Sequence, residues 1–242
     1  MIDDFFSVGI PKPKPRRLDA DEETKDWKEE MIATEFQNIS QGSDAWFAIK
    51  SGKISASRIN DMMAKTKSGW STSRENYMYE LAIERLTGQK TETFTSEHMR
   101  WGTENEPLAR SAYQVKKNIF VTEVAWVNHF SVKNSGCSPD GLIDDDRGII
   151  EIKCPLTKTH IKWMIDGVPP KEHINQMMWQ MAVTGRHYCD FVSFDPRLPE
   201  DLQLFVVRLE RDDKYIEMLT DEVAKFEEEV TMLVTKLKGI NK

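Results

Sequence analysis

The chain has 242 residues and carries 33 lysines and arginines against 40 aspartates and glutamates, so its formal net charge is −7. This length fits one large domain or two small ones, and a content of 39% hydrophobic and 30% charged residues is typical of a globular protein, not of a disordered chain. The sequence has no apolar run near the roughly 20 residues of a membrane-spanning helix, and its acidic start has no signal-peptide pattern. We therefore expect a cytoplasmic protein without a membrane partner.

The charge is distributed unevenly along the chain. Residues 19–30 hold seven acids and two bases, and residues 200–229 hold eleven acids and four bases. Residues 42–90, by contrast, hold eight bases and five acids. A protein that is acidic overall can still present a basic face to a polyanion, so the net charge does not exclude a nucleic-acid partner.

The cysteines and histidines argue against a zinc or iron–sulfur site. Cys137, Cys154 and Cys189 lie far apart without a C-x-x-C pair, and the five histidines lack the spacing of zinc ligands. We expect buried, reduced thiols instead.

Residues 1–37 form a predicted N-terminal extension, partly extended or disordered. Prolines alternate with basic residues between Pro11 and Arg17, which favours polyproline conformation and prevents a helix. The extension is either a solvated tether or an arm that contacts DNA or a partner. Residues 38–242 form the predicted folded domain.

Apolar periodicity predicts helices in the first half of this domain. A short helix over 43–50 ends near Gly52, an amphipathic segment follows Ser57, and longer helices cover 74–88 and 104–117. The side chains expected to face inward are Ile59, Met62 and Met63 in the second segment and Tyr77, Leu81 and Leu86 in the third.

The second half mixes strands and helices. The predicted strands lie within 119–133, in a hairpin over 138–156, and at 191–194 and 204–207, with helices over 171–184 and 212–237. This order predicts a single mixed α/β domain.

The predicted hairpin gathers charged side chains. Two apolar runs flank the polar turn 144–148, so Asp140 lies across from Glu151 or Ile152, with Cβ atoms about 5 Å apart. Glu151 and Lys153 share one face of their strand, while the alternate residues turn toward the core. Sequence logic alone therefore places two carboxylates and one ammonium group in a cluster.

Such a cluster suits a hard divalent cation. Mg²⁺ prefers oxygen ligands and accepts phosphate oxygens, and it lowers the pKa of a bound water and neutralises charge on a phosphate. A lysine beside it can orient or deprotonate the attacking water. The alternative is a surface Glu-x-Lys pair next to an ordinary Pro-Asp-Gly turn.

Six short motifs follow one another along the domain. They are residues 41–46 (QGSDAW), 55–57 (SAS), 101–106 (WGTENE), 137–141 (CSPDG), 151–155 (EIKCP) and 194–197 (FDPR). Their order and spacing resemble the YqaJ-type viral recombinase family of lambda-type phage exonucleases, within the PD-(D/E)xK nuclease superfamily. The resemblance covers roughly residues 38–235 and implies a restriction-endonuclease-like core, with a central mixed β-sheet flanked by helices.

The resemblance implies a Mg²⁺-dependent 5′→3′ exonuclease on linear double-stranded DNA. Such an enzyme hydrolyses one strand to mononucleotides that carry a 5′-phosphate and leaves a 3′ single-stranded overhang for recombination by strand annealing. It also implies two metal ions per site with Mn²⁺ as a substitute, a ring-shaped homotrimer, a single-strand annealing protein as partner, and the cytoplasm of a bacterial or phage-infected cell.

The resemblance also assigns residue roles. Asp140 and Glu151 match metal ligands, together with the carbonyl of Ile152. Lys153 matches the residue that positions or activates the nucleophilic water, and Gln176 matches a helical glutamine at the edge of the site.

Glu106 matches the upstream acid of the family, but residues 103–106 also form a capping-box pattern, in which the last glutamate returns to the cap amide. Glu104 is a second candidate for the acid, although the family's spacing from Trp101 favours Glu106.

A 5′-phosphate pocket is implied by Ser57 and Ser138, which match phosphate-binding hydroxyls, and by Lys50, which stands where the family has an arginine. Lysine is a point charge that cannot make the bidentate fork of arginine, so the strength of the phosphate preference stays open. The alternative for Lys50 is a solvated lysine at a helix end.

Two other functions remain open from the sequence. One is a structure-specific DNA endonuclease on the same core, which would also cut closed circular duplex. The other is a non-catalytic DNA-binding adaptor, although a binder has no need of the Asp140, Glu151 and Lys153 trio.

Overall fold

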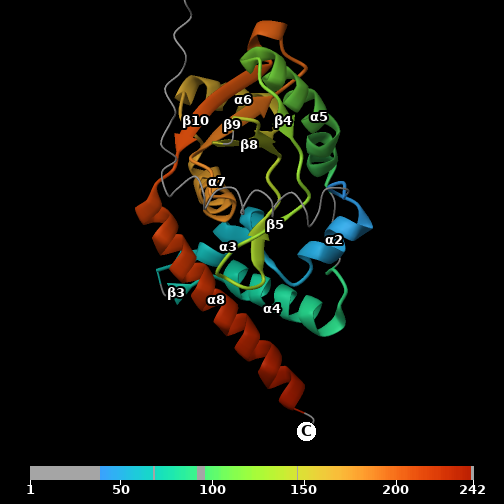
Figure 1. The fold of residues 1–242 in the computed structure, drawn as a ribbon, viewed down its shortest axis with the longest axis vertical. Helices are drawn as coiled ribbons and strands as arrows, with labels where there is room; N and C mark the ends of the chain where they lie inside the picture. The colour runs from blue at the N-terminus through green and yellow to red at the C-terminus, as the bar shows by residue number, and fades with distance from the viewer. Residues whose placement is uncertain (1–38, 68, 92–95, 146, 241–242) are drawn as a thin grey trace, which may run out of the picture. The chain divides into compact units, whose positions relative to one another are not determined.

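A computed structural model describes residues 39–240 except 68, 92–95 and 146. A five-stranded sheet forms the centre of this part of the chain (Figure 1). Strands β8 and β9 pair in parallel, and the other neighbouring pairs are antiparallel, so the sheet is mixed as expected. Across the sheet the strands are β10 (Leu204–Glu210), β9 (Tyr188–Phe194), β8 (Gly148–Lys153), β7 (Gly141–Ile143) and β4 (Val121–Thr122).

Helices cover both faces of this sheet. On one face, α5 (Glu97–Lys117) packs Ala109 and Tyr113 into a core cluster with Ile150 and Ile152 of β8. On the other face lies α7 (Lys171–Thr184), whose residues from Met177 onward are all buried. The chain passes from β8 to its parallel neighbour β9 through α6 (Thr157–Asp166) and α7, because a parallel pair needs a crossover connection.

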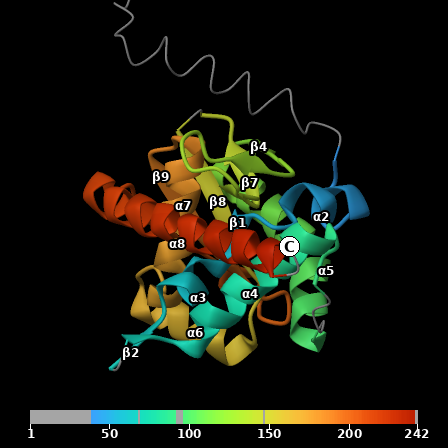
Figure 2. The ribbon, with the colours of Figure 1, turned by 90° about the horizontal axis from the view of Figure 1, so that it is seen from below.

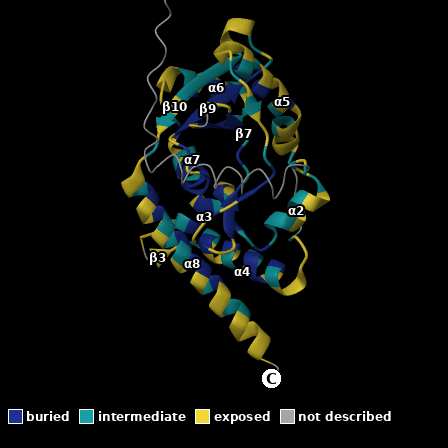
Figure 3. Ribbon diagram, in the orientation of Figure 1, coloured by how far each residue is buried: buried dark blue, intermediate teal, exposed yellow. Residues whose placement is uncertain are grey.

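The long helix α8 (Asp213–Gly239) packs along α4 (Thr72–Thr87) and α7, and Figure 2 shows it crossing in front of α4. Its buried residues recur at helical spacing, whereas its outer face and its last turns are exposed (Figure 3). The buried apolar set is Ile216, Leu219, Val223, Phe226 and Val230.

A smaller sheet connects the first helices to the centre. Its strands are β1 (Ile54–Ser55), β6 (Ser135–Cys137) and β5 (Val127–Asn128), with β6 in the middle. Around it lie α2 (Asp44–Lys50), a 3-10 turn over Ala56–Arg58, α3 (Ile59–Met63) and the two-stranded ribbon of β2 (Lys65–Thr66) and β3 (Gly69–Trp70).

The start of α5 corrects one expectation. The helix begins at Glu97, not near residue 104, and the side chain of Ser96 caps it by accepting a hydrogen bond from the Met99 amide at 3.2 Å. The capping-box interpretation of residues 103–106 is therefore wrong, because these residues lie inside the helix. The hydroxyl of Thr103 instead donates to the Met99 carbonyl.

The exposure of Leu86 corrects a second expectation, that its side chain faces inward. Leu86 is 40% exposed, while Tyr77 and Leu81 are each 2% exposed. At 100° per residue, Leu86 lies on the side of α4 opposite Tyr77, so it falls outside the buried stripe. Met63 is half-buried, in contrast to Met62 and Ile59.

The burial of the cysteines largely matches the expectation. Cys137 and Cys189 are buried free thiols, and Cys154 is a partly buried one. No described helix has the length and apolar character that crossing a membrane requires. The predicted extension 1–37 lies outside the described residues.

Candidate active site

Strand β8 carries the centre of the site. Its pairing aligns Gly141 with Ile150 and Leu142 with Ile149, and one further step of this register sets Asp140 opposite Glu151. The predicted hairpin register is thus present. The Ile152 amide donates to Oδ2 of Asp140 at 2.6 Å, which joins the two halves of the motif.

Glu151 is fully buried beneath α7. Its Oε1 accepts hydrogen bonds from the Lys153 ammonium and from Nε2 of Gln176, the latter at 2.7 Å. Its Oε2 accepts from Nε2 of Gln180, also at 2.7 Å. Three donors compensate for much of the cost of burying a carboxylate.

Gln180 is a residue that the sequence reasoning missed. It lies four residues after Gln176 on α7, so the two amides share one helix face. That spacing of four residues could have identified Gln180 as a second site residue from the sequence. Gln176, expected at the edge of the site, directly contacts the candidate metal ligand Glu151.

The charged groups strongly affect one another. Burial and the Glu151 carboxylate raise the pKa of Asp140 well above its usual range. Burial opposes the charged form of Lys153, but the carboxylates of Glu151 and Asp140 outweigh it and raise the pKa of Lys153. Lys153 is therefore protonated when no metal ion is bound. The carboxylates near it form a concentration of negative charge that a bound cation would reduce.

Arg110 joins Glu106 to this cluster. This largely buried arginine donates from Nε to the Asp140 carbonyl at 3.0 Å and from one terminal nitrogen to Oε1 of Glu106 at 2.6 Å. Its other terminal nitrogen donates to Oε1 of Glu123 at 2.8 Å. Burial raises the pKa of Glu106, while Arg110 opposes that rise and Glu151 adds to it. The sequence reasoning did not identify Arg110.

The structure separates the two candidate upstream acids. Glu106 is held by Arg110 and interacts electrostatically with Glu151 and Lys153. Glu104 is exposed, and its side chain has no hydrogen bond within the described residues. Geometry therefore favours Glu106.

A cavity of about 880 Å³ lies beside the acids, and both Glu106 and Arg110 line it. Its lining also includes residues of α2, β1, the 3-10 turn over Ala56–Arg58 and α4. Lys50, Ser57 and, after the end of α4, Lys90 are among them. The cavity thus has both basic and acidic lining residues, Glu80 and Glu84 among the acids, and it meets the acidic cluster at Glu106.

Lys50 lines this cavity in an unusual setting. Its Nζ lies 3.9 Å from the centre of the Trp46 ring. Burial and the neighbouring Lys90 lower the pKa of Lys50 to about 8. Lys50 is therefore a half-buried cation within the cavity, not a solvated residue at a helix end.

The two serines differ in their surroundings. Ser57 is exposed on the cavity wall, and its hydroxyl lies 3.2 Å from that of Ser55. Ser138 is linked to the wall through Trp46, whose indole nitrogen donates to the Ser138 hydroxyl at 2.9 Å. That hydroxyl in turn donates to the Ala125 carbonyl at 2.5 Å.

The donor set fits a hard divalent cation. No group of three or more His, Cys, Asp and Glu side chains suited to a metal occurs in the part of the chain that the structure describes. The candidate ligands are instead two carboxylates, Asp140 and Glu151, with the Ile152 carbonyl. Oδ1 of Asp140 accepts no hydrogen bond from the described residues, so it is available to a cation.

A family model for the YqaJ-like viral recombinase domain matches residues 45–187, more than half of the chain. The chain belongs to this family. The resemblance seen in the six motifs is thereby confirmed. No curated protein matched in the corresponding search.

Solved structures agree with this family. The chain is 46% identical to an alkaline exonuclease, LHK-Exo, from Laribacter hongkongensis, with a TM-score of 0.75 over 81% of this chain and 96% of that one. A second structure of that protein, with the same similarity, is a complex with dAMP. A phage-related exonuclease from Haemophilus somnus has a TM-score of 0.60 at 15% identity, over 76% of this chain and 96% of that one, and supports the fold alone. Membership of this family and the exonuclease relative support a nuclease.

Proposed function

We propose that this protein is a Mg²⁺-dependent 5′→3′ exonuclease that degrades one strand of linear double-stranded DNA to 5′-mononucleotides. The observation that carries the proposal is the cluster of Asp140, Glu151 and Lys153 beside Glu106, which lines a cavity that also holds Lys50 and Lys90. The dAMP complex of the 46% identical relative adds support, because dAMP is a nucleoside monophosphate of the kind that such an enzyme would release.

Each side chain has a role in the proposal. Asp140 and Glu151, with the Ile152 carbonyl, would hold the divalent cation. When bound, two ions of Mg²⁺ or a substituting Mn²⁺ would lower the pKa of a water and neutralise charge on the scissile phosphate. Lys153, which donates to Glu151, would position or activate the water. Gln176 and Gln180 hold Glu151 in place.

The cavity wall would receive the 5′-phosphate of the DNA end. Lys50 would supply a positive charge, and Ser57 an exposed hydroxyl on the same wall. Ser138 would contribute only after its hydroxyl leaves the Ala125 carbonyl. Residues 38–242 would form the exonuclease domain, with 1–37 as an extension. A homotrimeric ring and a single-strand annealing partner complete the proposal.

Digestion of DNA tests the function directly. Linear duplex with 5′-phosphorylated ends should be degraded in Mg²⁺ and left intact in EDTA, and closed circular duplex should persist. Labels at the 5′ and 3′ ends report polarity, since 5′ label should appear first as mononucleotide. Cleavage of the circle would instead favour the structure-specific endonuclease, and binding without cleavage would favour the adaptor.

The first prediction concerns Asp140. Asp140→Asn should reduce the rate of digestion by about 1,000-fold, because the site loses a charged oxygen donor. The matched control is Asp144→Asn on the same hairpin, where Asp144 accepts a hydrogen bond from Thr122 outside the acidic cluster. Similar rates for the two variants would show that the proposed metal site is wrong.

A further inference from the structure

The part of α5 that leads to Glu106 is weakly held by the rest of the protein. The buried residues of this helix begin only at Asn105, and Glu97–Arg100 are exposed. Gly102 is a poor helix former. Pro107 lacks the N–H that would bond to the Thr103 carbonyl, so the turn around Glu106 loses one helical hydrogen bond. This segment therefore needs an anchor outside the helix.

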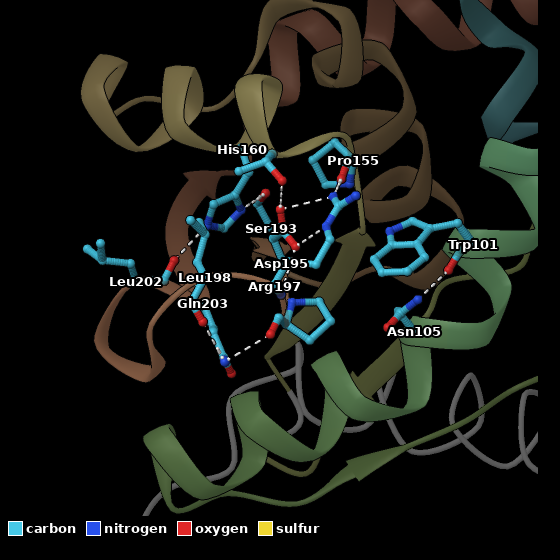
Figure 4. A network of polar contacts seen from close by, with 12 residues as sticks. Trp101, Asn105, Pro155, His160, Ser193, Asp195, Arg197, Leu198, Leu202 and Gln203 are labelled. Carbon is cyan, nitrogen blue, oxygen red and sulfur yellow. Dashed lines mark hydrogen bonds and ion pairs between the residues drawn. The ribbon is translucent and has the colours of Figure 1, made fainter.

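Trp101 provides the attachment point. It lies five residues before Glu106, and its carbonyl accepts a hydrogen bond from the side-chain Nδ2 of Asn105 at 2.9 Å. Its indole N–H is buried without a hydrogen-bond partner in the described structure, so hydrogen bonding does not fix the ring. The guanidinium of Arg197 lies over the Trp101 ring, 4.4 Å from the ring centre (Figure 4).

Arg197 is itself held by residues that closely follow β9 and β8. It donates to both oxygens of the Asp195 carboxylate, at 2.7 and 3.0 Å, and to the Pro155 carbonyl at 3.1 Å. Asp195 is fully buried and also accepts from the Thr157 hydroxyl at 2.5 Å. Pro155 comes two residues after Lys153, so one planar guanidinium joins the end of β8 to the start of α5.

We infer that Arg197 is a positioning residue. By stacking on Trp101 it holds the first turns of α5 against the end of β8, and so keeps Glu106 beside Lys153. An arginine suits this task because its planar fork can pair with a carboxylate and stack on an aromatic ring at once. The inference rests on the proposed function, and it gives a role to the WGTENE and FDPR motifs.

Arg208 offers a matched control elsewhere on the sheet. It donates to both oxygens of the buried Asp190, at 2.8 and 3.1 Å, and stacks 3.4 Å from the centre of the Tyr188 ring. Its side chain is 44% exposed, against 42% for Arg197. The two arginines thus make the same kinds of contact, but only Arg197 reaches Trp101.

The test compares Arg197→Gln and Arg208→Gln in the full chain, each alone and combined with Glu106→Gln. Arg197→Gln should lower kcat on linear duplex about tenfold with little change in KM, because a small misplacement of a reacting group is costly. It should also speed amide hydrogen exchange across residues 97–106, whereas Arg208→Gln should do neither. In the Glu106→Gln background Arg197→Gln should cause no further loss, because the effect passes through Glu106.

Three results would overturn the inference. They are unchanged exchange at 97–106, an unchanged kcat, and an equal loss of kcat in the Glu106→Gln background. If Arg197→Gln fails to fold, Arg197→Lys keeps a charge for Asp195 and loses the planar stack, and the same criteria apply. If wild-type protein digests no DNA, the proposed function fails, and the exchange comparison with Arg208→Gln still decides whether Arg197 anchors α5.

Discussion

At the residue scale, the site is a set of buried charges that hold one another in place. Glu151 has no exposed surface, and Lys153, Gln176 and Gln180 all donate to it. Arg110 likewise donates to the carboxylate of Glu106, and it also donates to the backbone carbonyl of Asp140. Burial makes each of these contacts stronger than it would be in water, and it makes an unpaired charge correspondingly costly. The protein thus assembles closely spaced carboxylates that only a bound cation would fully neutralise.

Lys50 leads to a prediction about pH. Its pKa is lowered to about 8, so it is charged at pH 7 and loses its charge as the pH rises toward 9. A terminal phosphate keeps its charge over this range, because its second pKa is about 6. The preference for 5′-phosphorylated over unphosphorylated ends, measured as a ratio of kcat/KM values, should therefore fall between pH 7 and pH 9.

Lys50→Arg is the control for this prediction, because arginine stays protonated at every pH used. Its preference for phosphorylated ends should be flat from pH 7 to pH 9. A wild-type ratio that is equally flat would mean that Lys50 does not contact the phosphate.

At the scale of elements, local rules predicted much of the fold. The hairpin of β7 and β8 has the predicted register, and α7 covers the predicted residues 171–184. The start of α5 was predicted too late because Glu97–Arg100 is an exposed, polar first turn without a buried stripe. Helix α6 was missed for a related reason, since it buries only His160 and Trp163 and leaves Ile161 and Ile165 exposed. Apolar periodicity in a sequence reveals a helix only where one apolar side of that helix packs against the rest of the protein.

The small sheet gives a prediction about stability. A Cβ added at Gly136, on the central strand β6, would lie 2.2 Å from the Val127 carbonyl oxygen and 2.6 Å from the Trp126 ring. Because a paired backbone cannot move aside cheaply, Gly136→Ala should lower the free energy of unfolding by about 2–3 kcal/mol, measured by urea denaturation.

Gly239→Ala is the matched change, since nothing lies within 4 Å of an added Cβ there. Its unfolding free energy should stay within about 0.5 kcal/mol of wild type. Equal urea midpoints for the two variants would show that β5 and β6 are not packed as closely as described.

At the scale of the whole molecule, the net charge of −7 is a poor guide to the partner. The C-terminal acids lie largely on the outer face of α8, whereas six basic and five acidic residues line the cavity, Lys50, Arg58 and Lys90 among the basic ones. Central acids such as Asp140 and Glu151 would lose their repulsion toward DNA once a cation is bound. The sum of the charges therefore does not exclude a DNA-binding face at the cavity.

The acidic outer face of α8 fits the proposed ring, in which acidic surfaces would face outward. Light scattering at working concentration should give a mass three times that of the 28.1 kDa chain. A strictly monomeric protein that still digests DNA would contradict the trimer while leaving the nuclease proposal intact.

The sequence by itself predicted the family, which the comparisons confirm, and the cluster at the centre of the candidate site. Asp140, Glu151 and Lys153 are brought together by strand alternation and one short hairpin, and both are local properties of the chain. Only the tertiary structure separated Glu106 from Glu104 and revealed the residues that support the site. The reason is physical, because these supports join elements far apart in the sequence, and packing rather than local periodicity decides which side chains meet. The supporting residues are Arg110, Gln180 and the Arg197 and Trp101 pair.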